Sequence, residues 1–229
     1  MVTSSKPVYR ALIVHAHPEP RSFSTAQAHT VAEQLRADGV ETTLVDLYAE
    51  HWDPVLSADQ FPDDPDSSGY FKPQAAQMNA VAQGSLGEPV ASQLRLLQDS
   101  DLLILSFPLW WFSMPAILKG WVDRVLVMGA AFGGEHGVRE QGGMRGKKAM
   151  VLLTTGGSQQ AFAPDTPGSY GSLDSFLFHI HQGTLEFCGF EVLPVLATFG
   201  PAHLDGAGRA QALETIREGI TSRLATEPA

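Results

Sequence analysis

The 229-residue sequence contains a single cysteine, Cys188, so it cannot form an internal disulfide and gives no sign of an oxidising compartment. Basic residues are also scarce: 15 Lys and Arg face 25 Asp and Glu, for a formal net charge of −10. This acidity argues against nucleic acid or an anionic membrane surface as the main partner. No apolar run approaches membrane-spanning length, and residues 1–6 lack the apolar core of a signal peptide. We therefore expect a cytoplasmic protein that does not insert into a membrane.

Several common functional motifs are missing as well. The chain has no Gly-x-Gly-x-x-Gly dinucleotide fingerprint, no Walker Lys-Ser/Thr and no Gly-x-Ser-x-Gly nucleophile motif. His179 and His181 would point to nearly opposite sides of a helix predicted over 172–188, so we expect no metal site. Cys188 is interpreted as a packed apolar residue, not a nucleophile.

Strand-like and helix-like segments alternate along the chain, which is typical of an α/β doubly wound parallel sheet with helices on both faces. The helical ranges are about 24–37, a segment from Pro115, 172–188 and 205–224. The predicted strands are 10–14, 41–45, 102–105, 149–153 and 191–196. Five such strands fit the flavodoxin-like order 2-1-3-4-5 as well as any alternative, within a single domain spanning residues 1–229.

Two segments interrupt this alternation. Residues 46–88 are rich in Pro, Asp, Ser and Gln and only weakly periodic, while residues 132–145 are Gly-rich and polar. Long loops inside a compact domain are usually functional or mobile.

The segment 101–124 is the most informative. A buried strand over 102–105 and a helix that begins at Pro115 enclose the aromatic sequence Leu109-Trp110-Trp111-Phe112. Ligands of open α/β sheets bind at the carboxyl ends of the strands. The aromatic residues could cap the core, but the cluster as a whole favours a wall for a flat, aromatic ligand.

Two other strand ends carry compatible features. The first strand is followed by His17 and by a turn in which Ser22 or Ser24 can cap the next helix, whose free N–H groups suit a phosphate. The fourth strand is followed by Thr154-Thr155-Gly156-Gly157, which lets a backbone approach a ligand closely. Each feature alone could equally be a plain helix cap or a tight turn. Together they favour one site, with His17, Tyr170 and His203 as its acid–base candidates.

These motifs resemble the flavodoxin-fold NAD(P)H dehydrogenase (quinone) family over residues 11–220. The similarity is carried by His17, Ser22-Phe23, Asp46-Leu47-Tyr48, Phe107-Pro-Leu-x-Trp111-Phe112, Pro115-Ala-Ile-Leu-Lys-Gly-Trp121, Thr154-Thr-Gly-Gly157 and Phe187-Cys-Gly-Phe190. The resemblance implies a homodimer with FAD at its interface. It also implies two-electron reduction of quinones by NAD(P)H in a ping-pong cycle, with FMN the less favoured cofactor.

The resemblance also implies a role for individual residues. His17, Phe23 and Ser24 would contact the FAD pyrophosphate region, and Arg209 the phosphate or adenine end. The isoalloxazine and ribityl would lie along Leu109, Trp110, Trp111 and Phe112, with Thr154, Thr155, Gly156 and Gly157 at the pyrimidine edge. Trp111, Tyr170 and Phe132 would line the substrate pocket, Phe132 from across the dimer interface. The backbone N–H groups of Gly156 and Gly157 would stabilise negative charge on the flavin, and Tyr170 would donate a hydrogen bond.

The chain departs from the family at the expected proton relay. The family's His falls on Tyr170 and its Tyr falls near Phe162. A Tyr hydroxyl, with a pKa near 10, is a poorer proton reservoir at neutral pH than His. Trp110 and Phe132 also replace other residue types.

Three other functions share the fold. One is an FMN-dependent azo- or nitro-compound reductase, and another is a flavin-binding regulatory subunit of a potassium efflux system. A flavodoxin-like electron carrier is a weaker alternative.

Overall fold

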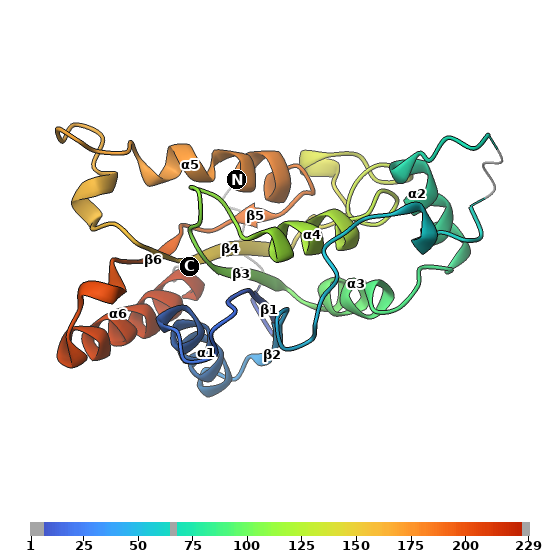
Figure 1. The fold of residues 1–229 in the computed structure, drawn as a ribbon. Helices are drawn as coiled ribbons and strands as arrows, with labels where there is room; N and C mark the ends of the chain where they lie inside the picture. The colour runs from blue at the N-terminus through green and yellow to red at the C-terminus, as the bar shows by residue number, and fades with distance from the viewer. Residues whose placement is uncertain (1–6, 65–67, 226–229) are drawn as a thin grey trace.

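The computed structural model describes residues 7–64 and 68–225, which form a parallel sheet covered by helices on both faces (Figure 1). The strand order is β2-β1-β3-β4-β5, with β6 also paired to β4. The strands are β1 Arg10–His15, β2 Glu41–Asp46, β3 Leu102–Pro108, β4 Lys148–Thr155, β5 Glu191–Val192 and β6 Leu196–Phe199. The flavodoxin-like order is therefore confirmed, with one strand more than predicted.

The two central strands, β3 and β4, are buried along their whole length. Ile104 of β3 is in register with Ile13 of β1 on one side and Met150 of β4 on the other. Burial on both faces explains why these strands read as continuous apolar runs. Because all pairs are parallel, the carboxyl ends of β1, β3 and β4 meet at one edge of the sheet.

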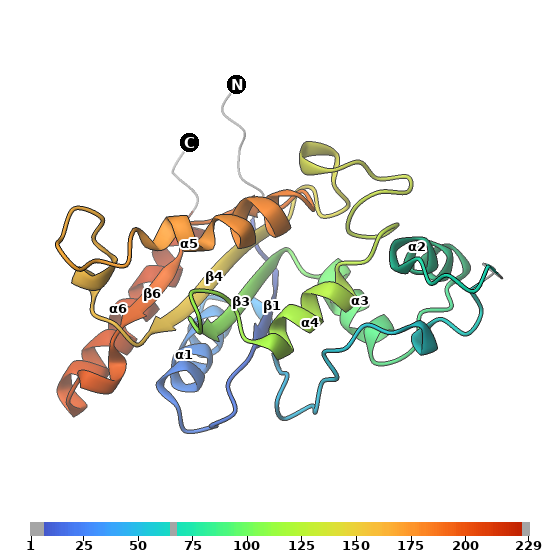
Figure 2. The same cartoon turned by 45° about the horizontal axis from the view of Figure 1, so that its top comes forward.

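The helices form two layers, visible in Figures 1 and 2. Helices α1 (Phe23–Ala37) and α6 (Gly206–Leu224) pack on one face, where Leu35 and Ile216 belong to the same core cluster as Ile104. The opposite face is covered by α3 Val90–Asp99, α4 Ala116–Val125 and α5 Leu173–Ile180. No helix within the described ranges combines the length and the hydropathy needed to cross a membrane.

The strand predicted over 191–196 is wrong in one respect, because it is broken into β5 and β6. Pro194 lies in the gap, and a proline has no N–H to donate to a sheet. Its carbonyl instead accepts a hydrogen bond from Nε of Arg223 on α6 at 2.8 Å. The helix predicted over 172–188 also ends early, since α5 passes into a π-helical turn at His181–Glu186.

The segment 46–88, expected to be a loop, contains helix α2 (Pro73–Gln83), which ends at the left-handed Gly84. This helix buries only Ala76, Gln77 and Ala80, so it has no broad apolar stripe to mark it in the sequence. It lies at one end of the molecule, beyond α3 and α4 (Figure 1). The loop predicted over 132–145 is irregular, apart from a 3-10 turn at Arg139–Gln141.

Candidate active site

The N-terminus of α1 forms one side of the candidate site. Ser22 is the cap, because its Oγ accepts a hydrogen bond from the Thr25 N–H at 3.1 Å. Ser24 does not cap the helix; its Oγ lies 2.6 Å from Oγ1 of Thr154, at the end of β4. As the first residues of the helix, Phe23 and Ser24 have no acceptor within it for their backbone N–H groups. These donors suit an anion such as a phosphate.

His17 stands between this turn and the aromatic residues. The Glu19 backbone N–H lies 3.0 Å from its Nδ1. The Glu19 carbonyl oxygen lies 3.2 Å from the same nitrogen, so Nδ1 faces both a donor and an acceptor of Glu19. The His17 ring centroid lies 5.9 Å from that of Trp110. His17 therefore holds an imidazole ring at the same sheet edge as the helix terminus.

The aromatic wall, residues 109–112, is a tight turn after β3. Trp110 and Ser113 exchange two backbone hydrogen bonds of 3.0 Å, while Trp111 and Phe112 adopt left-handed backbone angles, φ 51° and 56°. Non-glycine residues rarely adopt this conformation, and such strain concentrates at functional sites. The turn leaves the Trp111 side chain 97% exposed. A large apolar side chain held in the open, in a strained turn, is poorly explained by packing within the chain.

The glycine turn after β4 supplies the facing polar groups. It is tied to the wall because the Leu109 N–H donates to the Thr154 carbonyl at 2.8 Å. In the described part of the chain, the N–H groups of Gly156 and Gly157 have no protein acceptor. A side chain added at Gly156 would meet no atom within 4 Å, so open space adjoins the backbone at this residue.

Aromatic rings close the end of the site. Phe112 lies 5.4 Å from Tyr170 and 6.4 Å from Phe162, between ring centroids. Phe176 stacks on Phe112 at 4.3 Å, and Phe199 lies 5.7 Å from Phe162. Phe176 and Phe199 were not among the predicted site residues. The sequence marks them only by position: Phe176 lies in a predicted helix, and Phe199 follows a predicted strand.

Arg209, in the first turn of α6, reaches the same edge. Its Nε donates to the Pro201 carbonyl at 3.3 Å, and Gly200 N–H donates to the Thr155 carbonyl at 3.0 Å. Arg209 is therefore linked to Thr155, in the glycine turn, through the neighbouring residues Gly200 and Pro201. His203 lies in the exposed turn between them.

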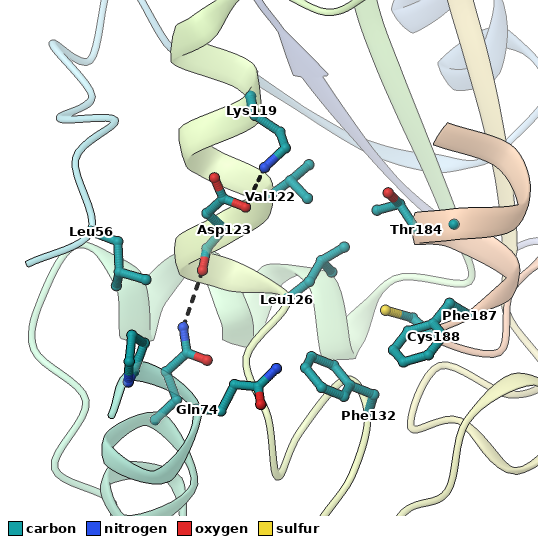
Figure 3. Close-up of a pocket in the computed structure, with 13 residues that line it drawn as sticks. Leu56, Gln74, Lys119, Val122, Asp123, Leu126, Phe132, Thr184, Phe187 and Cys188 are labelled. Carbon is teal, nitrogen blue, oxygen red and sulfur yellow. Dashed lines mark hydrogen bonds and ion pairs between the residues drawn. The ribbon is translucent and has the colours of Figure 1, made fainter. Parts of the chain in front are cut away.

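Phe132 is not in this cluster. It packs on Phe187 at 5.3 Å and lines a separate cavity of about 330 Å³, shown in Figure 3. The Lys119–Asp123 ion pair of 2.6 Å lies along the α4 side of this cavity, and Cys188 lies beside Phe187. Burial raises the pKa of the Cys188 thiol to about 12, so it stays protonated and unreactive at neutral pH.

His179 has a role that sequence reasoning missed. Its Nε2 lies 3.0 Å from Oγ of Ser113, so it ties α5 to the end of the wall turn. Among the described residues, no three His, Cys, Asp or Glu side chains are grouped to hold a metal ion.

The donors and the aromatic surface together fit a flavin. The wall offers an apolar face to a flat ring, the glycine turn offers free donors to its polar edge, and α1 with His17 and Arg209 offers donors and charge to a phosphate. A family model described as a flavodoxin-like fold matches residues 9–221. Mouse (Mus musculus) ribosyldihydronicotinamide dehydrogenase (quinone) is 38% identical, over 83% of this chain and 81% of its own. The chain belongs to the NAD(P)H dehydrogenase (quinone) family.

Two further comparisons agree with this membership. Rat (Rattus norvegicus) NAD(P)H dehydrogenase (quinone) 1 is 36% identical, over 90% of this chain and 74% of its own. A crystal structure from Klebsiella pneumoniae, provisionally assigned as a quinone reductase, superposes with a TM-score of 0.88. It is 35% identical and covers 96% of this chain and 86% of its own.

Proposed function

We propose that this protein is a homodimeric, FAD-dependent NAD(P)H:quinone oxidoreductase. The observation that carries the proposal is the meeting of three elements at one sheet edge: the exposed wall turn, the free N–H groups of the glycine turn and the N-terminus of α1. Relatives named as quinone dehydrogenases support the substrate class.

The chain's own residues bind and orient the cofactor. Trp110, Trp111 and Phe112 would stack on the ring, while Phe23, Ser24 and His17 would donate to the phosphates. A bound flavin would supply the two-electron redox chemistry that couples oxidation of NAD(P)H to reduction of the quinone. The Gly156 and Gly157 N–H groups would stabilise negative charge at the pyrimidine edge, an oxyanion-type contribution. Tyr170, which is 55% exposed, would donate a hydrogen bond from its hydroxyl at the open end of the site.

A site shared by two copies of the chain would account for the position of Phe132. If Phe132 lines the substrate pocket, it must come from a second copy of the chain, because within one chain it packs on Phe187. Trp111 and Phe178 are large apolar side chains left exposed in one copy, and such surfaces are typical of interfaces. One cleft used in turn by nicotinamide and quinone would give the ping-pong cycle.

The first experiment is to purify the protein, release its flavin with acid and identify it by chromatography. We expect FAD, and parallel initial-velocity lines when NADH or NADPH is varied at fixed quinone concentrations. Crossing lines would contradict the shared cleft. Released FMN would favour an azo- or nitro-compound reductase, and bound flavin without turnover would favour a regulatory subunit. A protein that binds neither flavin would refute the proposal.

A second experiment tests the dimer. Chains with Trp111→Ala and chains with Phe132→Ala should each form homodimers in which both sites are impaired, assayed at an FAD concentration that fills wild-type sites but not sites weakened about tenfold. After mixing and exchange, half the molecules are mixed dimers with one intact site, so about a quarter of the activity should return. Failure to recover activity, with exchange verified by mass, would rule out a site built from both copies.

A further inference from the structure

His15 is the last residue of β1 and is fully buried, yet it belongs to none of the groups proposed to touch the cofactor. Its Nδ1 lies 3.0 Å from Oγ of Ser106 on β3, and its Nε2 lies 3.0 Å from Oγ1 of Thr25 on α1. The side chain thus bridges two elements that carry opposite parts of the site. Ser106 comes three residues before Leu109, and Thr25 comes one residue after Ser24.

The partners of Thr25 settle which nitrogen carries the proton. The Thr25 hydroxyl donates its single hydrogen to the Glu19 carbonyl at 3.2 Å, and a carbonyl can only accept. Toward His15 the hydroxyl must therefore accept, so Nε2 donates. In the neutral ring Nδ1 then accepts, and the Ser106 hydroxyl donates to it.

The same hydroxyl organises the turn before α1. Thr25 Oγ1 lies 2.9 Å from Oγ of Ser22, the helix cap, whose backbone N–H donates to the Glu19 carbonyl at 3.0 Å. The Thr25 hydroxyl, which His15 orients, therefore contacts both the Ser22 cap and the Glu19 carbonyl. These two groups define the turn that leads into Phe23 and Ser24.

We propose that His15 is a positioning residue, which sets the phosphate-binding turn at the start of α1 against the wall that follows β3. This inference rests on the proposed function, because it assumes that a flavin phosphate occupies the turn. His15 does not touch the cofactor; it acts through Thr25. Its loss should therefore weaken binding of flavins that carry phosphate and leave binding of the ring unchanged.

The test compares three substitutions and two ligands. His15→Gln keeps an amide N–H near the place of Nε2, His15→Asn keeps only a group near Nδ1, and His15→Leu keeps neither. We expect His15→Asn and His15→Leu to weaken FAD binding to the apoprotein about tenfold, since one well-placed hydrogen bond is lost. His15→Gln should restore FAD affinity to within about threefold. Riboflavin, which has the ring and ribityl but no phosphate, should bind all four proteins equally.

Equal losses for FAD and riboflavin would overturn the inference, because a general loosening of the core would affect both. A His15→Leu variant with the same affinity for FAD as the wild type would also overturn it. If the His15 variants fail to fold, Thr25→Val and Thr25→Ser replace them: the valine variant should lose FAD affinity and the serine variant should keep it. A wild-type protein that binds no flavin refutes the proposed function itself, which is a separate outcome.

Discussion

Ser24 Oγ and Thr154 Oγ1 lie 2.6 Å apart, although 130 residues separate them in the chain. Both side chains are buried, and the bond joins the start of α1 to the end of β4. This contact joins the phosphate side of the proposed site directly to the strand that leads into the glycine turn.

Breaking that pair should cost stability. Ser24→Ala and Thr154→Val each leave a buried hydroxyl without its partner, so each should lower the free energy of unfolding by about 1–3 kcal/mol. The double variant should lose less than the sum, because both partners are then gone. Urea unfolding of the flavin-free protein measures this. Thr215→Ala, which removes an exposed hydroxyl on α6, is the control and should change stability by less than about 0.5 kcal/mol. Additive losses would show that the pair is not coupled.

The buried His15 should make stability depend on pH. Burial lowers its pKa from 6.5 to about 4, an effect that the nearby Asp46 charge partly opposes. Between these values the unfolded chain binds a proton that the folded chain does not, so the stability present above pH 6.5 falls as the pH falls. The loss should reach about 3 kcal/mol at pH 4. The difference between wild type and His15→Gln, measured by denaturant unfolding from pH 7 to 4, isolates this slope. Identical pH profiles would contradict it.

Trp111 should matter to the cofactor and not to the fold. Its side chain is 97% exposed, so Trp111→Ala should change the unfolding free energy by less than about 0.5 kcal/mol. Loss of a stacked ring should nevertheless weaken FAD binding about tenfold. Tyr70→Ala, at another exposed aromatic residue, should affect neither quantity. An unchanged dissociation constant for FAD in Trp111→Ala would show that this residue of the wall does not contribute to cofactor binding.

Gly120 should tolerate no side chain, although it lies inside α4. A methyl group there would collide with the backbone of Pro54, so Gly120→Ala should lower stability by about 1–3 kcal/mol. Helix propensity alone predicts the opposite sign, a gain of about 1 kcal/mol. Gly206→Ala, at the open start of α6, is the matched control, with stability unchanged or slightly raised in thermal unfolding. A gain in both variants would mean that the chain around Pro54 is free to move away.

Tyr170→Phe isolates the proposed donor. The ring contacts with Phe112 and Phe162 remain, so stability should change by less than about 0.5 kcal/mol. Loss of a hydrogen bond to a charged group should lower kcat for quinone reduction about 10- to 100-fold. Tyr170→His should retain activity and add a dependence on pH near 6.5. Wild-type turnover in the phenylalanine variant would exclude the hydroxyl from the reaction.

Much of the architecture could be predicted because a buried strand or helix face leaves a recognisable pattern of apolar residues in the local sequence. The apolar runs of β3 and β4 and the stripe of α4 identify their elements without reference to partners. Helix α2 escaped prediction because it buries only three small or polar residues. The strand breaks at Pro194 because proline has no N–H to donate to the sheet. The neighbouring residues are apolar, so the hydrophobic pattern does not reveal the break.

The sequence by itself determined the alternation of strands and helices, the strand ends that carry the candidate site and the residue types available there. Only the tertiary structure decided that Ser22 is the cap, that Ser24 reaches Thr154, that Phe132 packs on Phe187 and that His15 joins β3 to α1. Periodicity reports which face of an element is buried. The partner that a side chain meets depends on strand register and helix packing, which bring together residues far apart in the chain.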